Sequence, residues 1–136
     1  MRFETKIGIA VLDELAVWQK LNVTAFLASA VAGGQSEVIG EPYEDGSGNN
    51  YLSMFRQPVL VYTAGANALV RARTKALARG LATAIYTDEL FKTGNDDDNR
   101  AAVRVVPAGE LRLVGLAVYG PRNDVDPVLK GLSLHP

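Results

Sequence analysis

The segment that most constrains the fold lies at the start of the chain, where a short apolar run leads into a long one. Residues 7–12 are apolar without a break, as in a strand that is covered on both faces of its sheet. After two acidic residues, 18–32 form an apolar helix pattern, and Gly33 and Gly34 permit a left-handed C-cap. Because this helix is apolar nearly all round, we expect it to be packed deeply in an α/β domain.

Further strand and helix patterns follow at the spacing of a single α/β domain. Strands are expected at 6–12, 58–64, 82–87 and 113–119, with a closing edge strand within 131–136. Further helices are expected at 67–79, 96–105 and 124–129. A chain of 136 residues is typical of one domain. We therefore expect one three-layer α/β/α sandwich over residues 1–136, with a small mixed sheet between the helices.

The segment 37–55 interrupts this pattern between the first helix and the second strand. Its middle, 44–50, reads EDGSGNN, and glycine and asparagine permit the positive φ angles of tight reversals. We expect a hairpin-like excursion at the sheet edge, acting as a lid over the ligand site.

Composition excludes several classes of function. The chain has no cysteine and a single histidine, His135, next to the last residue, so thiol chemistry and a thiolate metal site are excluded and a histidine-based triad is improbable. We expect no metal and no cofactor. Arg71, Lys75 and Arg79 form a cationic row at helical spacing, but three charges are a small footprint for nucleic acid. We therefore interpret this row as a solvated helix face and do not expect nucleic acid as a partner.

No apolar run reaches the length of a membrane helix, and no signal-peptide pattern opens the chain. We therefore expect a soluble cytoplasmic protein with no membrane partner.

The acidic cluster at 95–99, with sequence NDDDN, allows two interpretations. Oxygen ligands at alternate positions suggest a calcium loop, but Arg100 stands where that loop needs glycine and Val106 where it needs glutamate. Acidic residues also stabilise the start of a helix. We therefore expect helix capping rather than a metal site.

A polar line on the first helix is the leading candidate site. Trp18, Asn22 and Ser29 share one helix face. Ligands of open α/β sheets bind beyond the carboxyl ends of the strands. There we expect residues 13–14, 87–88 and 120–121 to meet, which brings Asp88 near Trp18 and Asn22. In the alternative, equally weighted, Asn22 and Ser29 bond to backbone and Asp88 caps a short helix at 89–93.

Four segments resemble a known family: DELAVWQKLNVTAFLASAVAG, GEPY followed by NNYLSMFRQPVLVY, RARTKALARGLATAIYTDELF and VGLAVYGPRNDVDPVLKGLSLHP. Together they look like the uncharacterised bacterial domain-of-unknown-function family DUF2000, which is distantly similar in fold to the type II peptidyl-tRNA hydrolases. The resemblance implies a peptidyl-tRNA hydrolase II-like mixed sheet between helices and, by analogy with the fold alone, a possible homodimer.

The hydrolases carry a lysine and a histidine on their first helix and an aspartate after a strand. The matching positions here are Asn22, Ser29 and Asp88, so of these three only the aspartate is kept. The resemblance leaves two functions open. The first is a ligand-binding or regulatory module for a small molecule, using Trp18, Asn22, Ser29, Asp88 and Thr93. The second is a hydrolase of a peptidyl-tRNA-like or other aminoacyl-linked substrate, with Asp88 as the catalytic residue that orients water and Asn22 and Thr93 as donors. The loss of the lysine favours the first.

Overall fold

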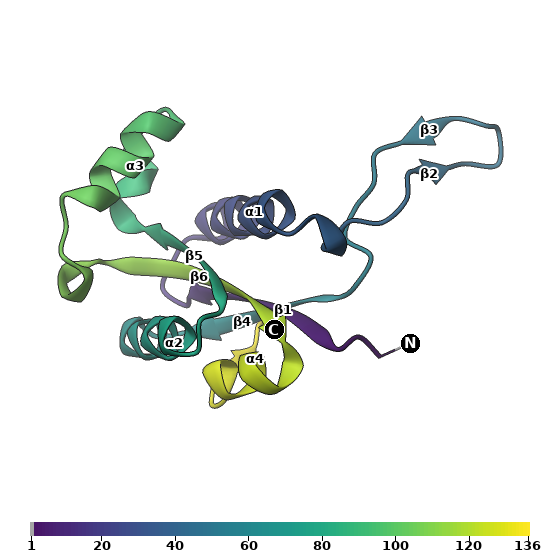
Figure 1. The fold of residues 1–136 in the computed structure, drawn as a ribbon. Coiled ribbons are helices and arrows are strands. Elements are labelled where there is room, and N and C mark those ends of the chain that lie inside the picture. The colour runs from purple at the N-terminus through teal and green to yellow at the C-terminus, as the bar shows by residue number, and fades with distance from the viewer. Residues whose placement is uncertain (1) are drawn as a thin grey trace.

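A five-stranded mixed sheet forms the centre of the computed structural model, which describes residues 2–136 (Figure 1). The strand order is β5-β6-β1-β4-β7, with β1 parallel to β4 and every other neighbouring pair antiparallel. The strands are β1 (Thr5–Leu12), β4 (Val59–Ala64), β5 (Ala82–Thr87), β6 (Leu113–Pro121) and β7 (Ser133–Leu134). The four predicted strands and the closing edge strand are confirmed.

Four helices pack around this sheet: α1 (Val17–Gly34), α2 (Ala66–Ala78), α3 (Asp96–Arg104) and α4 (Arg122–Leu129). In Figure 1, α1 lies on one face of the sheet while α2 and α4 cover the other. Each face has its own core, because Ile9 of β1 packs with Leu27 of α1, whereas Ala10 packs with Leu69 and Leu129 on the opposite side. Short 3-10 turns link these elements at η1 (Ser36–Val38), η2 (Asp88–Lys92) and η3 (Ala108–Glu110).

Close contact between α1 and the sheet depends on a glycine of β6. A Cβ atom built on Gly115 would lie 2.4 Å from a methyl group of Val23 and 2.9 Å from one of Leu27. Both α1 side chains are buried. The missing side chain at Gly115 therefore sets the height of α1 above the sheet.

The expectation that α1 is deeply packed is wrong. Its buried residues are Val23, Leu27 and Val31, whereas Trp18 is 62% exposed and Leu21 is 67% exposed. The physical reason is that no second helix packs beside α1 on this face within the described residues 2–136. α3 contributes no buried residue and stands away from the body of the domain (Figure 1).

The expected meeting of residues 13–14, 87–88 and 120–121 is also wrong. β6 runs antiparallel to β1, and Pro121 pairs with Thr5 at the beginning of that strand. Residues 13–14 follow the other end of β1, at the same end of the sheet as Thr87 of β5, with β6 between the two strands. An apolar strand has the same hydropathy in either direction, so the pattern contains no information about this reversal.

The excursion forms a two-stranded hairpin of β2 (Tyr43–Glu44) and β3 (Asn50–Tyr51), which confirms the predicted reversal. Gly48 has a φ of 86°, and the Asp45 carboxylate accepts hydrogen bonds from Ser47, Asn49 and Tyr51. The hairpin projects beyond the C-terminal end of α1 (Figure 1). No hairpin residue lines the candidate pocket near the N-terminal half of α1, so in this structure the hairpin is not a lid over it.

Candidate functional site

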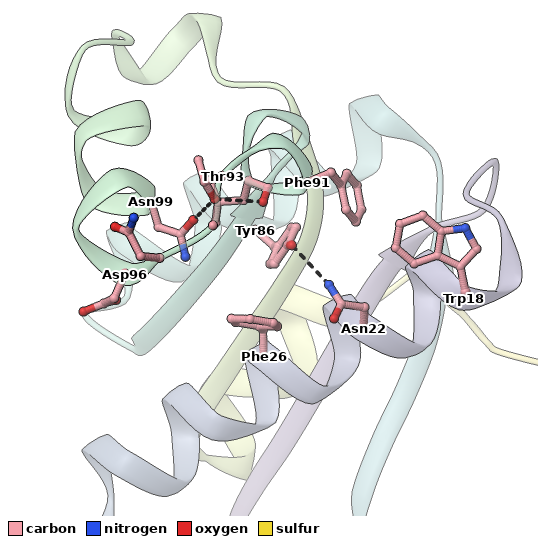
Figure 2. A pocket seen from close by; sticks show the side chains of 11 residues that line it. Trp18, Asn22, Phe26, Tyr86, Phe91, Thr93, Asp96 and Asn99 are labelled. Carbon is pink, nitrogen blue, oxygen red and sulfur yellow. Dashed lines mark hydrogen bonds between the residues drawn. The ribbon is translucent and has the colours of Figure 1, made fainter.

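The N-terminal half of α1, the end of β5, the η2 turn and the start of α3 enclose a pocket of about 340 Å³ (Figure 2). Eleven residues line this pocket. Those that carry the argument below are Trp18, Asn22, Phe26, Tyr86, Phe91, Thr93, Asp96 and Asn99. The sequence pattern placed Trp18 and Asn22 on one face of a helix, and the structure turns that face toward β5 and η2.

Four aromatic rings form a continuous series along the pocket. The Trp18 and Phe91 ring centroids are 5.9 Å apart in an edge-to-face arrangement, and Phe91 lies 5.1 Å from Tyr86. Phe26 then meets Tyr86 edge-to-face at 5.6 Å. Such pairs hold one another in fixed orientations and present flat apolar faces to a ligand. The pocket wall is therefore suited to a planar ring.

A hydrogen bond between α1 and β5 lies within this aromatic series. The side-chain amide nitrogen of Asn22 donates to the Tyr86 hydroxyl at 3.2 Å. Burial raises the pKa of the Tyr86 hydroxyl above its ordinary value, and the bond from Asn22 offsets part of this increase. Tyr86 therefore stays protonated at neutral pH. Its proton and the Asn22 carbonyl oxygen have no partner within residues 2–136, which leaves one donor and one acceptor side by side.

A second polar group closes the pocket on the side of α3. The Thr93 hydroxyl lies 3.0 Å from the carbonyl oxygen of Leu90 and also contacts the side-chain oxygen of Asn99. These contacts tie the loop after η2 to α3. The amide nitrogen of Asn99 has no acceptor in the described part of the chain, so it offers a further donor to the pocket.

The charge of the lining disfavours anions. Asp96 is the one charged residue among the eleven, and Arg100 forms ion pairs with both Asp96 and Asp97. The Asn95 side chain caps α3 by accepting a hydrogen bond of 2.8 Å from the Asp98 amide, which confirms the capping interpretation of the acidic cluster. Residues 2–136 contain no group of three acidic, histidine or cysteine side chains placed to hold a metal ion.

The structure brings together three of the five predicted site residues. Trp18, Asn22 and Thr93 line the same pocket, but Ser29 lies further along α1 and donates to the Phe26 carbonyl oxygen at 2.6 Å. Asp88 does not line the pocket, and its backbone amide donates to the carbonyl oxygen of Arg112 at 3.0 Å.

The alternative of purely structural roles applies in part. Ser29 does bond to the backbone of its own helix, as that alternative expected. Asn22 instead bonds to a side chain. Asp88 is the first residue of η2, where Thr87 holds the N-cap position and no side chain caps the turn.

The sequence does not single out the other residues that complete the pocket, among them Tyr86, Phe91 and Asn99. Tyr86 lies one residue before the end of a strand that was treated as apolar, and Phe91 belongs to the short helix expected at 89–93. Asn99 was considered only as part of the acidic cluster. The available signal was the pair of aromatic residues Tyr86 and Phe91, followed by Thr93, at the strand end where ligands commonly bind.

One of the three positive charges in the cationic row on α2 is paired with an acidic residue. Arg79 pairs with Asp124 of α4 at 3.4 Å, while Arg71 and Lys75 are exposed. Two free charges form a smaller footprint than the three in the sequence pattern, which favours the solvated face.

Comparison with known proteins decides the family. The model of DUF2000, described as a protein of unknown function, matches residues 5–136. This chain belongs to the DUF2000 family. The protein of a solved structure, the protein of unknown function Atu0240 from Agrobacterium tumefaciens strain C58, is 41% identical to this chain. The match has a TM-score of 0.96 and covers 99% of this chain and 100% of the other.

The predicted DUF2000 resemblance is confirmed, and so is the expected α/β fold with helices packed on a mixed sheet. No curated protein matches the chain significantly. None of the helices described for this DUF2000 protein is long and apolar enough to cross a membrane.

Proposed function

We propose that this DUF2000 protein is a ligand-binding module that holds a small uncharged molecule with a planar ring in the pocket between Trp18, Asn22 and Tyr86. The observation that carries the proposal is the Asn22–Tyr86 hydrogen bond, set within a series of aromatic rings. Ligand sites combine apolar side chains with placed polar groups, and this pocket offers both, because an aromatic wall stands opposite amide and hydroxyl side chains.

The hydrogen-bonding groups of the pocket favour a ring with a donor next to an acceptor. The Asn22 carbonyl oxygen accepts, and the Tyr86 hydroxyl donates. Heterocyclic amides and nucleobases carry such an edge. Their flat faces also suit the exposed Trp18 ring, which stands at the mouth of the pocket (Figure 2).

The charges around the pocket favour a neutral ligand over an anion. The lining contains no lysine, arginine or histidine, and the first turn of α3 carries Asp96, Asp97 and Asp98. Arg100 compensates Asp96 and Asp97 but does not line the pocket, so a phosphate or carboxylate bound there would have no cationic partner. The pocket at the start of α3 therefore differs from the helix N-termini that bind phosphate.

We further propose that the scaffold is of the type II peptidyl-tRNA hydrolase kind and serves binding rather than hydrolysis. Asn22 and Thr93, the donors of the hydrolase alternative, line the pocket, but Asp88 does not. A hydrolase needs a group that transfers a proton near neutral pH. Asp96, the one titratable carboxyl of the lining, is held by Arg100. These observations support binding without turnover.

Thermal unfolding in the presence of matched pairs of small molecules tests this proposal. Nicotinamide and nicotinate share one ring, as do uracil and orotate, and the second member of each pair carries a carboxylate. A ligand present at a hundred times its dissociation constant stabilises the fold by about 2.7 kcal/mol. We expect the neutral member of each pair to raise the midpoint temperature of unfolding and the anion to leave it unchanged.

The matched variants are Asn22→Ala in the pocket and Asn67→Ala, which is exposed on α2 on the opposite face of the sheet. Only Asn22→Ala should remove the stabilisation. Stabilisation by the anions alone, or an equal loss in both variants, would contradict the proposal.

A further inference from the structure

The outer edge of the sheet at β5 has no strand beside it. β5 ends the strand order and pairs with β6 alone. The outward-facing backbone amides and carbonyls of 82–87 therefore have no strand partner within residues 2–136. Exposed edges in natural proteins usually carry charges or proline that block pairing. β5 has the sequence ATAIYT and carries neither, so its edge is chemically open to a further strand.

A cavity of about 530 Å³ runs along this edge. Ala84 and Ile85 belong to the cores on opposite faces of the sheet, yet both line this cavity. Successive strand residues point to opposite faces, so a cavity that touches both must follow the strand edge itself. It shares five lining residues with the ligand pocket, namely Phe26, Tyr86, Leu90, Asp96 and Asn99. A further cavity of about 260 Å³ extends it past Ala82 and Thr83.

We infer that this groove binds an extended peptide segment of a partner protein, which adds to β5 as a sixth strand of the sheet. Helices wall the groove on both sides, with Phe26 and Ala30 of α1 on one side and Val103 of α3 on the other. A single extended segment fits between such walls. The edge of a second copy of this chain would bring its own α1 and α3, so the observations favour a peptide over a dimer. Strand addition of this kind is a general mode of peptide recognition.

Charge at the groove specifies the chemistry of the peptide. Arg100 is neutralised by Asp96 and Asp97, whereas Arg104 lines the groove with no ion-pair partner in the described part of the chain. Most of the other lining residues are apolar, and Ala30, Ala84 and Val103 among them are small or aliphatic. The groove therefore takes small or aliphatic side chains and a carboxylate near Arg104. This inference uses the backbone edge of β5 and does not rest on the proposed small-molecule function.

The test uses an acetylated hexapeptide of alternating threonine and valine with a free terminal carboxylate. Amide resonances of the ¹⁵N-labelled full chain report where it binds, and hydrogen exchange reports which amides become protected. We expect shifts and protection at 82–87. Two matched peptides separate the contribution of the backbone hydrogen bonds from that of the terminal carboxylate. N-methylation at alternate residues removes the backbone donors and should abolish binding, and a terminal amide in place of the carboxylate should weaken binding by about two- to fivefold.

Arg104→Glu should weaken binding of the free-acid peptide by a similar factor and should affect binding of the amide peptide less. Arg71→Glu, on exposed α2 across the sheet, is the matched control and should change neither. No binding at millimolar peptide, equal binding of the N-methylated peptide, or protection centred away from β5 would overturn the inference. Protection of 82–87 that grows with protein concentration in the absence of peptide, with dimers seen in sedimentation, would overturn it in favour of a second copy.

Discussion

The amide of Asn22 on α1 donates a hydrogen bond to the hydroxyl of Tyr86 on β5, although 64 residues separate the two in the chain. This contact joins the helix to the end of the edge strand and leaves an unsatisfied donor and acceptor facing the pocket. It links the fold of this DUF2000 protein to its proposed ligand site.

Replacing Tyr86 by phenylalanine tests the structural part of that link. The variant keeps the aromatic contacts and removes one hydrogen bond, so we expect the free energy of unfolding to fall by about 0.5–1.5 kcal/mol in urea titration. Tyr119→Phe is the matched control, because Tyr119 is buried to a similar degree and its hydroxyl forms no side-chain hydrogen bond within the described residues. Equal losses in the two variants would show that the Asn22 bond contributes nothing.

Gly115→Ala tests what sets the height of α1 above the sheet. The added methyl group would lie 2.4 Å from Val23, so the helix must shift or the side chains must leave their rotamers. We expect a loss of about 1–3 kcal/mol in the free energy of unfolding. Gly109→Ala, where the added methyl group has no neighbour within 4 Å, is the control and should be close to neutral. An unchanged stability of Gly115→Ala would contradict the account.

Acid should loosen the β2–β3 hairpin. Hydrogen bonds from Tyr51 and Asn49 hold the pKa of Asp45 well below its ordinary value. A carboxyl with a lowered folded pKa contributes stability that is complete above the unfolded value of about 3.9 and is lost as pH falls toward the folded value. Amide exchange at 43–51, measured by NMR below pH 4, should therefore rise as pH falls, after correction for intrinsic exchange. Asp45→Asn should remove this pH dependence, and a persistent dependence would assign it to another group.

Asn95→Ala tests the cap of α3. Loss of an N-cap commonly costs about 0.5–2 kcal/mol of helix stability. Because α3 contributes no buried residue, we expect α3 to open locally while the global unfolding midpoint stays constant. Hydrogen exchange should accelerate at 98–104 and not in α2. The exposed Asn67→Ala serves as the control, and a lowered global midpoint would show that α3 is coupled to the core.

The covered strand and apolar helix at the start of the chain were predictable because burial on both faces leaves a continuous apolar pattern. Strand direction was not, since an apolar run such as β6 has the same hydropathy in both directions. The exposure of one face of α1 could not be predicted either, because hydropathy does not say whether a second helix is present to cover Leu21. Trp18 and Asn22 were found through helical periodicity, but their partner Tyr86 requires knowledge of which strand lies beside α1.

The most direct test of the central claim uses Trp18, the single tryptophan of the chain, which lies at the mouth of the pocket. Its fluorescence is titrated with nicotinamide and uracil and with their carboxylated counterparts, nicotinate and orotate. The account predicts a saturable change with a neutral member, binding about tenfold weaker or more for its anion, and loss of the change in Asn22→Ala. Tighter binding of the anions, or no saturable change with any of the four, would contradict it.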